Sequence, residues 1–191
     1  MSIPKSSQRR LLRLISARAD MEYSTEAFRL FQAASGTAAD YHLFLSMVVC
    51  YCRPFTQGRG IGSILCEYPD YPDFPDPEMN TRHQRMMDIR HNFSSHSSIE
   101  GTRAYLLAPQ SLHPDTKEIQ NDFYYAVAKR HLQHPEYAPW LHNVVDQFAV
   151  RLDADIRVIA KEIGSNYLAD GDTYELDTGA DNFTWTPAKG A

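Results

Sequence analysis

The densest group of side chains capable of chemistry lies between residues 82 and 96, where three arginines and three histidines occur. Within it, five residues separate Arg90 from His96. A guanidinium group binds phosphate oxygens through paired hydrogen bonds, and an imidazole exchanges protons near neutral pH. The spacing predicts that Arg90 and His96 converge on one phosphate, either within one chain where the helix distorts or across a two-fold axis between two copies.

Three further side chains, Arg53, His83 and Arg85, are candidates for substrate binding. His83 precedes Arg90 by seven residues, so the two share one face of a helix. Arg53 either adds a second phosphate contact or closes a helix end through an ion pair, and we favour the ion pair. Arg90 also has a structural alternative, in which it caps carbonyl groups at the centre of a bundle.

The sequence predicts neither a metal site nor a cofactor. His83, His91 and His96 match no common spacing of metal ligands. The segment Gly58–Gly62 lacks the Lys-Ser/Thr pair that a phosphate-binding loop requires. Three cysteines are too few, and odd in number, for a disulfide framework, so we expect free thiols.

The elements that must position these residues are predicted to be mainly α-helical. Apolar residues with helical spacing predict a first helix that continues through Phe31 before Gly36. Three more helices are expected over Thr37–Phe55, Pro77–Phe93 and Pro135–Ile163, with Gly164 ending the last of them. We therefore predict an up-and-down helical bundle of four to five helices.

We assign residues 1–164 to a single domain with two interruptions. An aromatic-Pro-Asp repeat in loop 67–77 is either a docking strip or a rigid connection to the next helix, and we favour the connection. Residues 102–128 predict a small β-hairpin, with a helix from Thr116 onward as the alternative. The acidic segment 165–191 is predicted to be a flexible C-terminal tail.

The net charge of -5 does not exclude an RNA substrate. Residues 170–191 carry five acidic side chains and one basic one, which contributes -4, whereas residues 1–20 carry +4. The longest apolar run, Tyr41–Cys52, is shorter than the ~20 residues of a membrane span. Without a recognisable signal peptide, the chain is expected to be cytoplasmic and to have no membrane contact.

The segment Arg90-His91-Asn92-Phe93-Ser94-Ser95-His96 resembles the motif of the HEPN superfamily, in which Arg and His are separated by four to six residues and a polar residue follows the Arg. A helix ending in Arg53-Pro54-Phe55 and a Gly-rich loop precede the motif, as in a group of uncharacterised bacterial HEPN-like proteins. The resemblance covers roughly residues 37–100.

This resemblance implies an all-α bundle that forms homodimers through the motif helices and, in active members, cleaves RNA without a metal in toxin or defence biology. It assigns His96 as general acid and base, Arg90 as the phosphate clamp, and His91 or Asn92 as orienting groups. Toxins of this superfamily that pair with a nucleotidyltransferase antitoxin often carry Tyr two residues after the His. Ser98 occupies that position here, which argues against such a partner.

Overall fold

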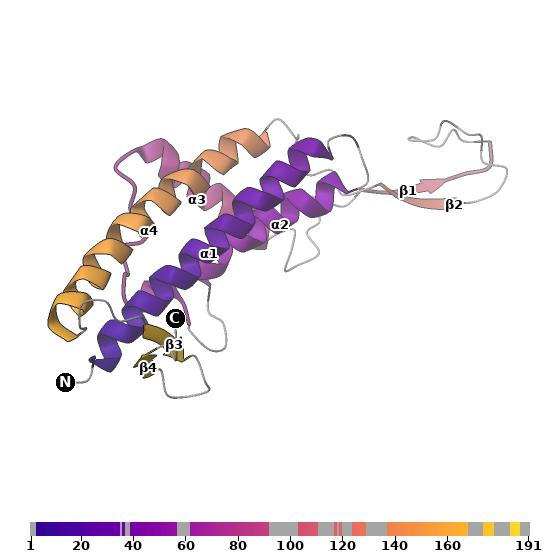
Figure 1. Ribbon diagram of the computed structural model, residues 1–191. Helices are drawn as coiled ribbons and strands as arrows, with labels where there is room; N and C mark the ends of the chain where they lie inside the picture. The colour runs from indigo at the N-terminus through magenta and orange to yellow at the C-terminus, as the bar shows by residue number, and fades with distance from the viewer. Residues whose placement is uncertain are drawn as a thin grey trace.

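Apolar residues repeated every three or four positions form four helices in the computed structural model (Figure 1). The helices are α1 (Lys5–Ala33), α2 (Asp40–Cys52), α3 (Pro77–Ile89) and α4 (Tyr137–Tyr167), and two 3₁₀ turns, η1 (Arg53–Phe55) and η2 (Ile64–Cys66), lie between α2 and α3. The structure describes residues 3–34, 36, 39–56, 62–91, 103–110, 117, 119, 124–128, 137–167, 174–177 and 184–187. Within these residues the protein is mainly α-helical, as the sequence predicts.

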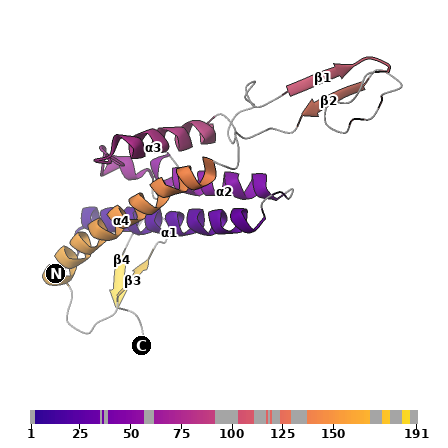
Figure 2. The same ribbon diagram turned by 90° about the horizontal axis from the view of Figure 1, so that it is seen from above.

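The longest helices, α1 and α4, form the frame of the bundle. α1 packs against α2 and α4, and α3 packs against α4 and α2, so that the four helices enclose one core (Figures 1 and 2). The Ser24 hydroxyl on α1 donates a buried hydrogen bond of 2.8 Å to the Met47 carbonyl on α2, which links the two helices. Among the described residues, no helix has both the length and the apolar character that a membrane span requires.

An aromatic cluster centred on Phe148 of α4 occupies the middle of the core. The Phe148 side chain is fully buried. Its ring centroid lies 5.0–6.4 Å from those of four other rings, which come from α2, η1 and the loop before α3: Tyr51, Phe55, Tyr71 and Phe74. At these separations, edge-on and tilted ring pairs stabilise a fold by more than the burial of their apolar surface alone would. One ring of α4 therefore joins three other parts of the chain.

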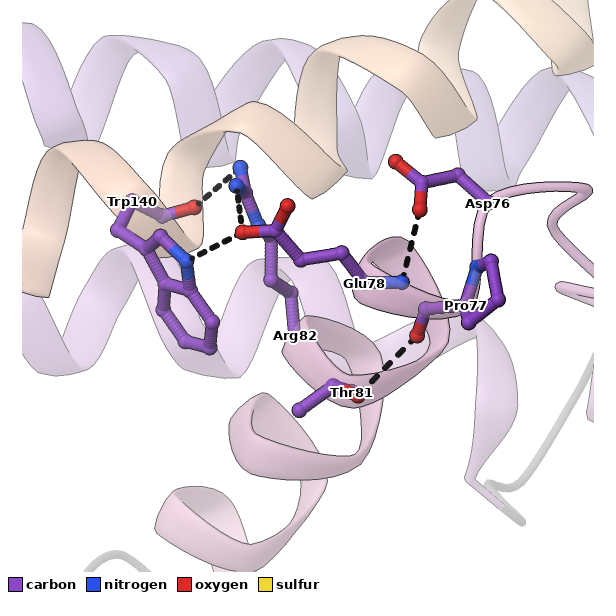
Figure 3. Close-up of polar contacts among 6 residues, drawn as sticks. All are labelled: Asp76, Pro77, Glu78, Thr81, Arg82 and Trp140. Atoms are coloured by element: carbon purple, nitrogen blue, oxygen red, sulfur yellow. Dashed lines mark hydrogen bonds and ion pairs between the residues drawn. The ribbon is translucent and has the colours of Figure 1, made fainter.

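The first turn of α3 begins as its sequence predicts. The Asp76 carboxylate accepts a hydrogen bond of 2.9 Å from the Glu78 backbone N–H, and Pro77 takes the first helical position (Figure 3). The cap thereby satisfies a backbone donor that has no partner inside the helix. The cap at Asp76 fixes both the residue at which α3 begins and the direction in which the helix leaves the loop.

A buried arginine fastens α3 to α4. Arg82 donates to the Trp140 carbonyl at 3.0 Å and to the Glu78 carboxylate at 2.5 Å, and its guanidinium lies 5.0 Å from the centre of the Trp140 ring (Figure 3). The Trp140 indole N–H donates to the same carboxylate at 3.0 Å. Arg82 thus has a structural function, although it belongs to the basic segment that the sequence singles out.

The aromatic-Pro-Asp loop is fastened between α1 and α4. Tyr68 and Tyr71 stack with their ring centroids 4.8 Å apart, Arg10 of α1 lies over Tyr68, and Arg151 of α4 lies over Tyr71. The Tyr71 hydroxyl also donates a hydrogen bond to Asp155 of α4. Since Tyr71 is buried, as is Phe74, these rings of the repeat pack inside the protein.

The ends of two helices differ from the sequence prediction. α2 ends at Cys52, and Arg53–Phe55 form the tighter turn η1, because Pro54 has no backbone N–H to donate to the Cys50 carbonyl; Arg53 keeps helical dihedral angles, and the chain becomes extended at Thr56. α4 continues through Gly164 to Tyr167, so the prediction that Gly164 ends this helix is wrong. The buried Ile163 and the half-buried Tyr167 hold this last turn against the core.

Two antiparallel hairpins flank the bundle. β1 (Arg103–Leu107) pairs with β2 (Tyr124–Ala128), in the segment where the sequence predicts a hairpin. β3 (Tyr174–Asp177) pairs with β4 (Thr184–Pro187), within the segment predicted to be a flexible tail. Figures 1 and 2 show that β1 and β2 extend away from the helices, whereas β3 and β4 lie near the N-terminal half of α1.

We expect Phe148→Ala to lower the free energy of unfolding by about 3–5 kcal/mol, because it leaves a cavity among four aromatic rings. The matched control is Val150→Ala on the same helix, where 67 % of the side chain is exposed and the loss should stay below about 0.5 kcal/mol. Urea denaturation followed by circular dichroism measures both. Similar losses in the two variants would contradict a core centred on Phe148.

Candidate functional site

Arg90 and His91 lie in a wide, π-helical turn that continues the C-terminal end of α3. The Arg90 backbone N–H bonds to the carbonyls of Met86 and Met87, which keeps the turn attached to the helix. The Arg90 side chain is half-buried, and His91 is exposed. Single π-helical turns occur frequently at functional sites, because they change the direction of side chains at the end of a helix.

The last turn of α2 lies next to Arg90. Burial raises the pKa of the Cys52 thiol to about 12, and the positive charge of Arg90 opposes this rise. The two residues belong to helices that pack against each other, α2 and α3, so the charge acts across the α2–α3 interface. Sequence reasoning did not identify Cys52 as a neighbour of the motif, because residues 38 positions apart carry no local signal of contact.

His96 and Asn92, which the sequence assigns to catalysis with Arg90 and His91, lie outside the described residues. The described part of the predicted catalytic group is therefore the pair Arg90 and His91 at the end of α3. Its chemistry is that of a cation beside an exposed imidazole, which suits an anionic ligand such as a phosphate.

Arg53 forms an ion pair with α1. Its guanidinium donates to the Asp20 carboxylate at 2.6 Å, while 57 % of the Arg53 side chain and 12 % of the Asp20 side chain remain exposed. Burial raises the pKa of Asp20, and the ion pair opposes that rise. The structure contains the ion pair that we favour for Arg53, with a partner on α1 rather than on the motif helix. Asp20 could have been found from the sequence as the one acid among the first twenty residues.

His83 lies in the aromatic core beneath the motif. Its Nδ1 atom is 2.8 Å from the Tyr51 hydroxyl, and its ring packs edge-on against Phe55 at 4.8 Å. Burial lowers the pKa of His83 to about 4, so the imidazole is neutral at pH 7. The structure thus places this predicted substrate-binding residue where it joins α3 to α2.

Arg85 completes the set of predicted substrate-binding residues. It lies half-buried on α3, between His83 and Arg90 along the chain. Successive helical positions are rotated by about 100°, so Arg85 lies on a different face of α3 from the other two. The described residues therefore place Arg53 and Arg90 around the C-terminal turn of α2, with His83 beneath them and Arg85 to one side.

The C-terminal end of α2 adds an electrostatic reason for this arrangement. The last carbonyls of a helix carry a partial negative charge, which favours cations near that end. Arg53 directly follows α2, and the charges of Arg53 and Arg90 act on Cys50 and Cys52, respectively. In the described part of the chain, no three His, Cys, Asp or Glu side chains gather as metal ligands would.

Comparisons with known proteins add no relatives. The sequence matches no protein-family model, and the chain matches neither a curated protein nor a solved structure.

We expect the free energy of unfolding to fall as the pH drops from about 6.5 to about 4. A histidine whose pKa is lowered in the folded state takes up its proton first in the unfolded chain, so acid favours unfolding in this window. A shift of this size in the pKa of His83 corresponds to about 3 kcal/mol of unfolding free energy. His142, whose pKa burial also lowers, adds to the fall.

Urea denaturation at pH 7.0 and pH 4.5 measures this dependence. His83→Gln should reduce it, since an amide keeps a hydrogen bond to Tyr51 without titrating, whereas Val150→Gln at an exposed position of α4 should leave it unchanged. An undiminished pH dependence in His83→Gln would show that His83 is not buried as a neutral imidazole.

Proposed function

We propose that this protein is a HEPN-like, metal-independent endoribonuclease that acts as a homodimer, in toxin or defence biology. The observation that carries the proposal is the position of Arg90 and His91 in a π-helical turn at the end of α3, beside the C-terminal turn of α2. This turn leads directly into the segment that contains Asn92 and His96, the remaining residues of the motif.

The proposed reaction is attack of an RNA 2′-hydroxyl on the adjacent phosphate. The attacking oxygen must lose a proton, the leaving oxygen must gain one, and the negative charge that develops on the phosphate must be stabilised. His96 transfers the protons, because an ordinary histidine pKa lies near neutral pH. Arg90 holds the phosphate through its guanidinium fork, and His91 or Asn92 orients it.

The homodimer supplies a second copy of the motif. Each chain offers a single Arg90 and a single His96 within the motif, whereas the reaction needs one group to accept a proton and another to donate one. Two motifs related by a two-fold axis provide both groups. Arg53 and Arg85 then add positive charge on either side of the RNA backbone, and Arg53 retains its ion pair with Asp20.

We expect purified protein to cleave labelled structured RNA in EDTA, and His96→Ala to lower the single-turnover rate at least ~10²-fold, the contribution of a proton-transferring side chain. The matched control is His42→Ala, an exposed histidine on α2 that should leave the rate unchanged. Wild-type protein that cleaves none of several RNAs, or a His96→Ala variant that cleaves them equally well, would refute catalysis by the motif.

The alternative function is a catalytically inactive HEPN-like module for dimerisation, nucleotide binding or protein interaction. Two contacts favour it: His83 is bound to Tyr51 in the core, and Arg53 is paired with Asp20. Both residues stabilise the fold, and neither needs a substrate to explain its position. On this view Arg90 serves the same purpose at the α2–α3 interface.

Arg90→Ala separates the two functions. If the protein is a nuclease, Arg90→Ala folds with nearly unchanged stability and loses RNA cleavage, because the guanidinium is needed to bind the phosphate. If the protein is an inactive module, Arg90→Ala loses about 2 kcal/mol or more of unfolding free energy, because buried polar groups lose the guanidinium as their partner. Thermal unfolding and the cleavage assay are measured together, with Arg157→Ala on the exposed face of α4 as the control.

A further inference from the structure

The imidazole of His142 joins α4 to α1 through both of its nitrogen atoms. Its Nδ1 lies 3.3 Å from the Asp146 carboxylate on α4, and its Nε2 lies 3.3 Å from the Thr25 hydroxyl on α1. A carboxylate, an imidazole and a hydroxyl thus form one chain of polar contacts. Such a group of three is recognised by its geometry and by the role of each member, whatever the order of the residues in the sequence.

The arrangement follows from helical spacing on both elements. His142 and Asp146 are four positions apart on α4, and Thr25 and Phe28 are three positions apart on α1, so each pair shares one helix face. The Phe28 ring stacks on the imidazole, with the ring centroids 4.2 Å apart and the ring planes inclined by 15°. Because α1 packs along α4 (Figures 1 and 2), one face of α1 both fixes the plane of the imidazole and brings the hydroxyl to its edge.

The partners of the imidazole assign its tautomer. An ionised carboxylate only accepts hydrogen bonds, so the neutral ring carries its proton on Nδ1, which faces Asp146. Nε2 is then an acceptor, and the Thr25 hydroxyl donates to it. Burial lowers the pKa of His142, although the charge of Asp146 opposes this effect, so the imidazole is neutral at pH 7. A neutral imidazole whose lone pair is directed at a hydroxyl has the arrangement of a general base.

Two other exposed hydroxyls on helices show how Thr25 differs from them. The Thr81 hydroxyl on α3 and the Ser46 hydroxyl on α2 each donate to the backbone carbonyl four positions earlier, at 3.1 Å and 2.9 Å. Bonding of this kind is common for a hydroxyl inside a helix. The Thr25 hydroxyl is turned toward His142 instead. Because Thr25 is exposed, a reagent in solution reaches it, whereas the imidazole behind it is buried.

We propose that Thr25 is a nucleophile that accepts the acyl group of an activated carboxylic ester, with His142 as its general base and Asp146 as the residue that positions the imidazole. The hydroxyl proton moves to Nε2 as the Thr25 oxygen bonds to the carbonyl carbon of the ester. The bond from that carbon to the leaving oxygen then breaks, and the imidazolium gives its proton to the leaving alcohol. The products are an acyl ester on Thr25 and the free alcohol.

The position of Thr25 also sets how far the reaction goes. Thr25 lies in the interior of α1, where backbone N–H groups bond to carbonyls of the same helix. These donors are therefore not directed at the negative oxygen of the intermediate, as the backbone donors of a hydrolase are. We expect slow acylation, and still slower hydrolysis of the unactivated threonine ester, so that the acyl group stays on Thr25. This covalent modification does not depend on the proposed nuclease function.

The first test is incubation of the purified protein with para-nitrophenyl acetate at pH 7, followed by mass spectrometry of its peptides over time. We expect Thr25 to be acetylated at least ~10²-fold faster than Thr81, which is also exposed but donates to a backbone carbonyl. Peptide mapping separates this product from acetylated lysine and cysteine. Equal rates at the two threonines, or no acetyl group on Thr25, would overturn the proposal.

The second test assigns the role of each partner by the rate at which Thr25 is acetylated. His142→Gln should slow it at least ~10²-fold, since the amide cannot act as the base. Asp146→Asn should slow it about tenfold or more, and Asp146→Glu should restore most of the rate, because it keeps the carboxylate that orients the imidazole. The matched control is Asp153→Asn, which removes a different carboxylate from α4 and should leave the rate unchanged.

Circular dichroism shows whether each variant is folded. A folded His142→Gln protein with the wild-type rate would overturn the general base, and a wild-type rate in Asp146→Asn would overturn the positioning role. If His142→Gln does not fold, the two Asp146 variants decide the question, since this exposed carboxylate reaches Thr25 only through the imidazole. Slow acetylation in Asp146→Asn that Asp146→Glu restores then supports the proposal.

Discussion

The packing of Phe148 is the constraint on which the other parts of the structure depend. Its ring contacts Tyr51 and Phe55 on one side and the rings of the aromatic-Pro-Asp loop on the other. These contacts hold the C-terminal end of α2 against α4. His83 then packs on Tyr51 and Phe55, which sets the position of α3 and of Arg90 at its end. The described part of the candidate site, Arg90 and His91, is therefore positioned by an aromatic core.

Arginine side chains make the ion pairs between elements that the structure describes. Arg13 pairs with Glu67, Arg18 with Asp153 and Arg53 with Asp20, and each pair joins α1 to another part of the chain. Ion pairs near the surface add little net stability, so their effect is chiefly to fix geometry. Some basic side chains of α1 are consequently paired with acidic side chains of the same protein. A count of charges in the sequence overstates how many cations are available to an anionic ligand.

Local signals in the sequence predicted the elements well, and contacts between distant residues decided the exceptions. Asp76 and Pro77 mark the start of α3, because capping depends only on neighbouring residues. Gly164 was predicted to end α4, but the helix continues, because Ile163 and Tyr167 still pack against the core. The preference of one glycine is worth about 1 kcal/mol, which such packing readily exceeds.

The sequence alone determined the mainly α-helical class of fold and the approximate places of the four described helices, since periodicity and residue type are local properties. Only the tertiary structure decided what each candidate side chain does. His83 and Arg90 share one spacing pattern, yet His83 is a neutral core residue, whereas Arg90 lies half-buried beside Cys52. Burial and the nearest charge control the protonation of a side chain, and both depend on residues far away in the chain.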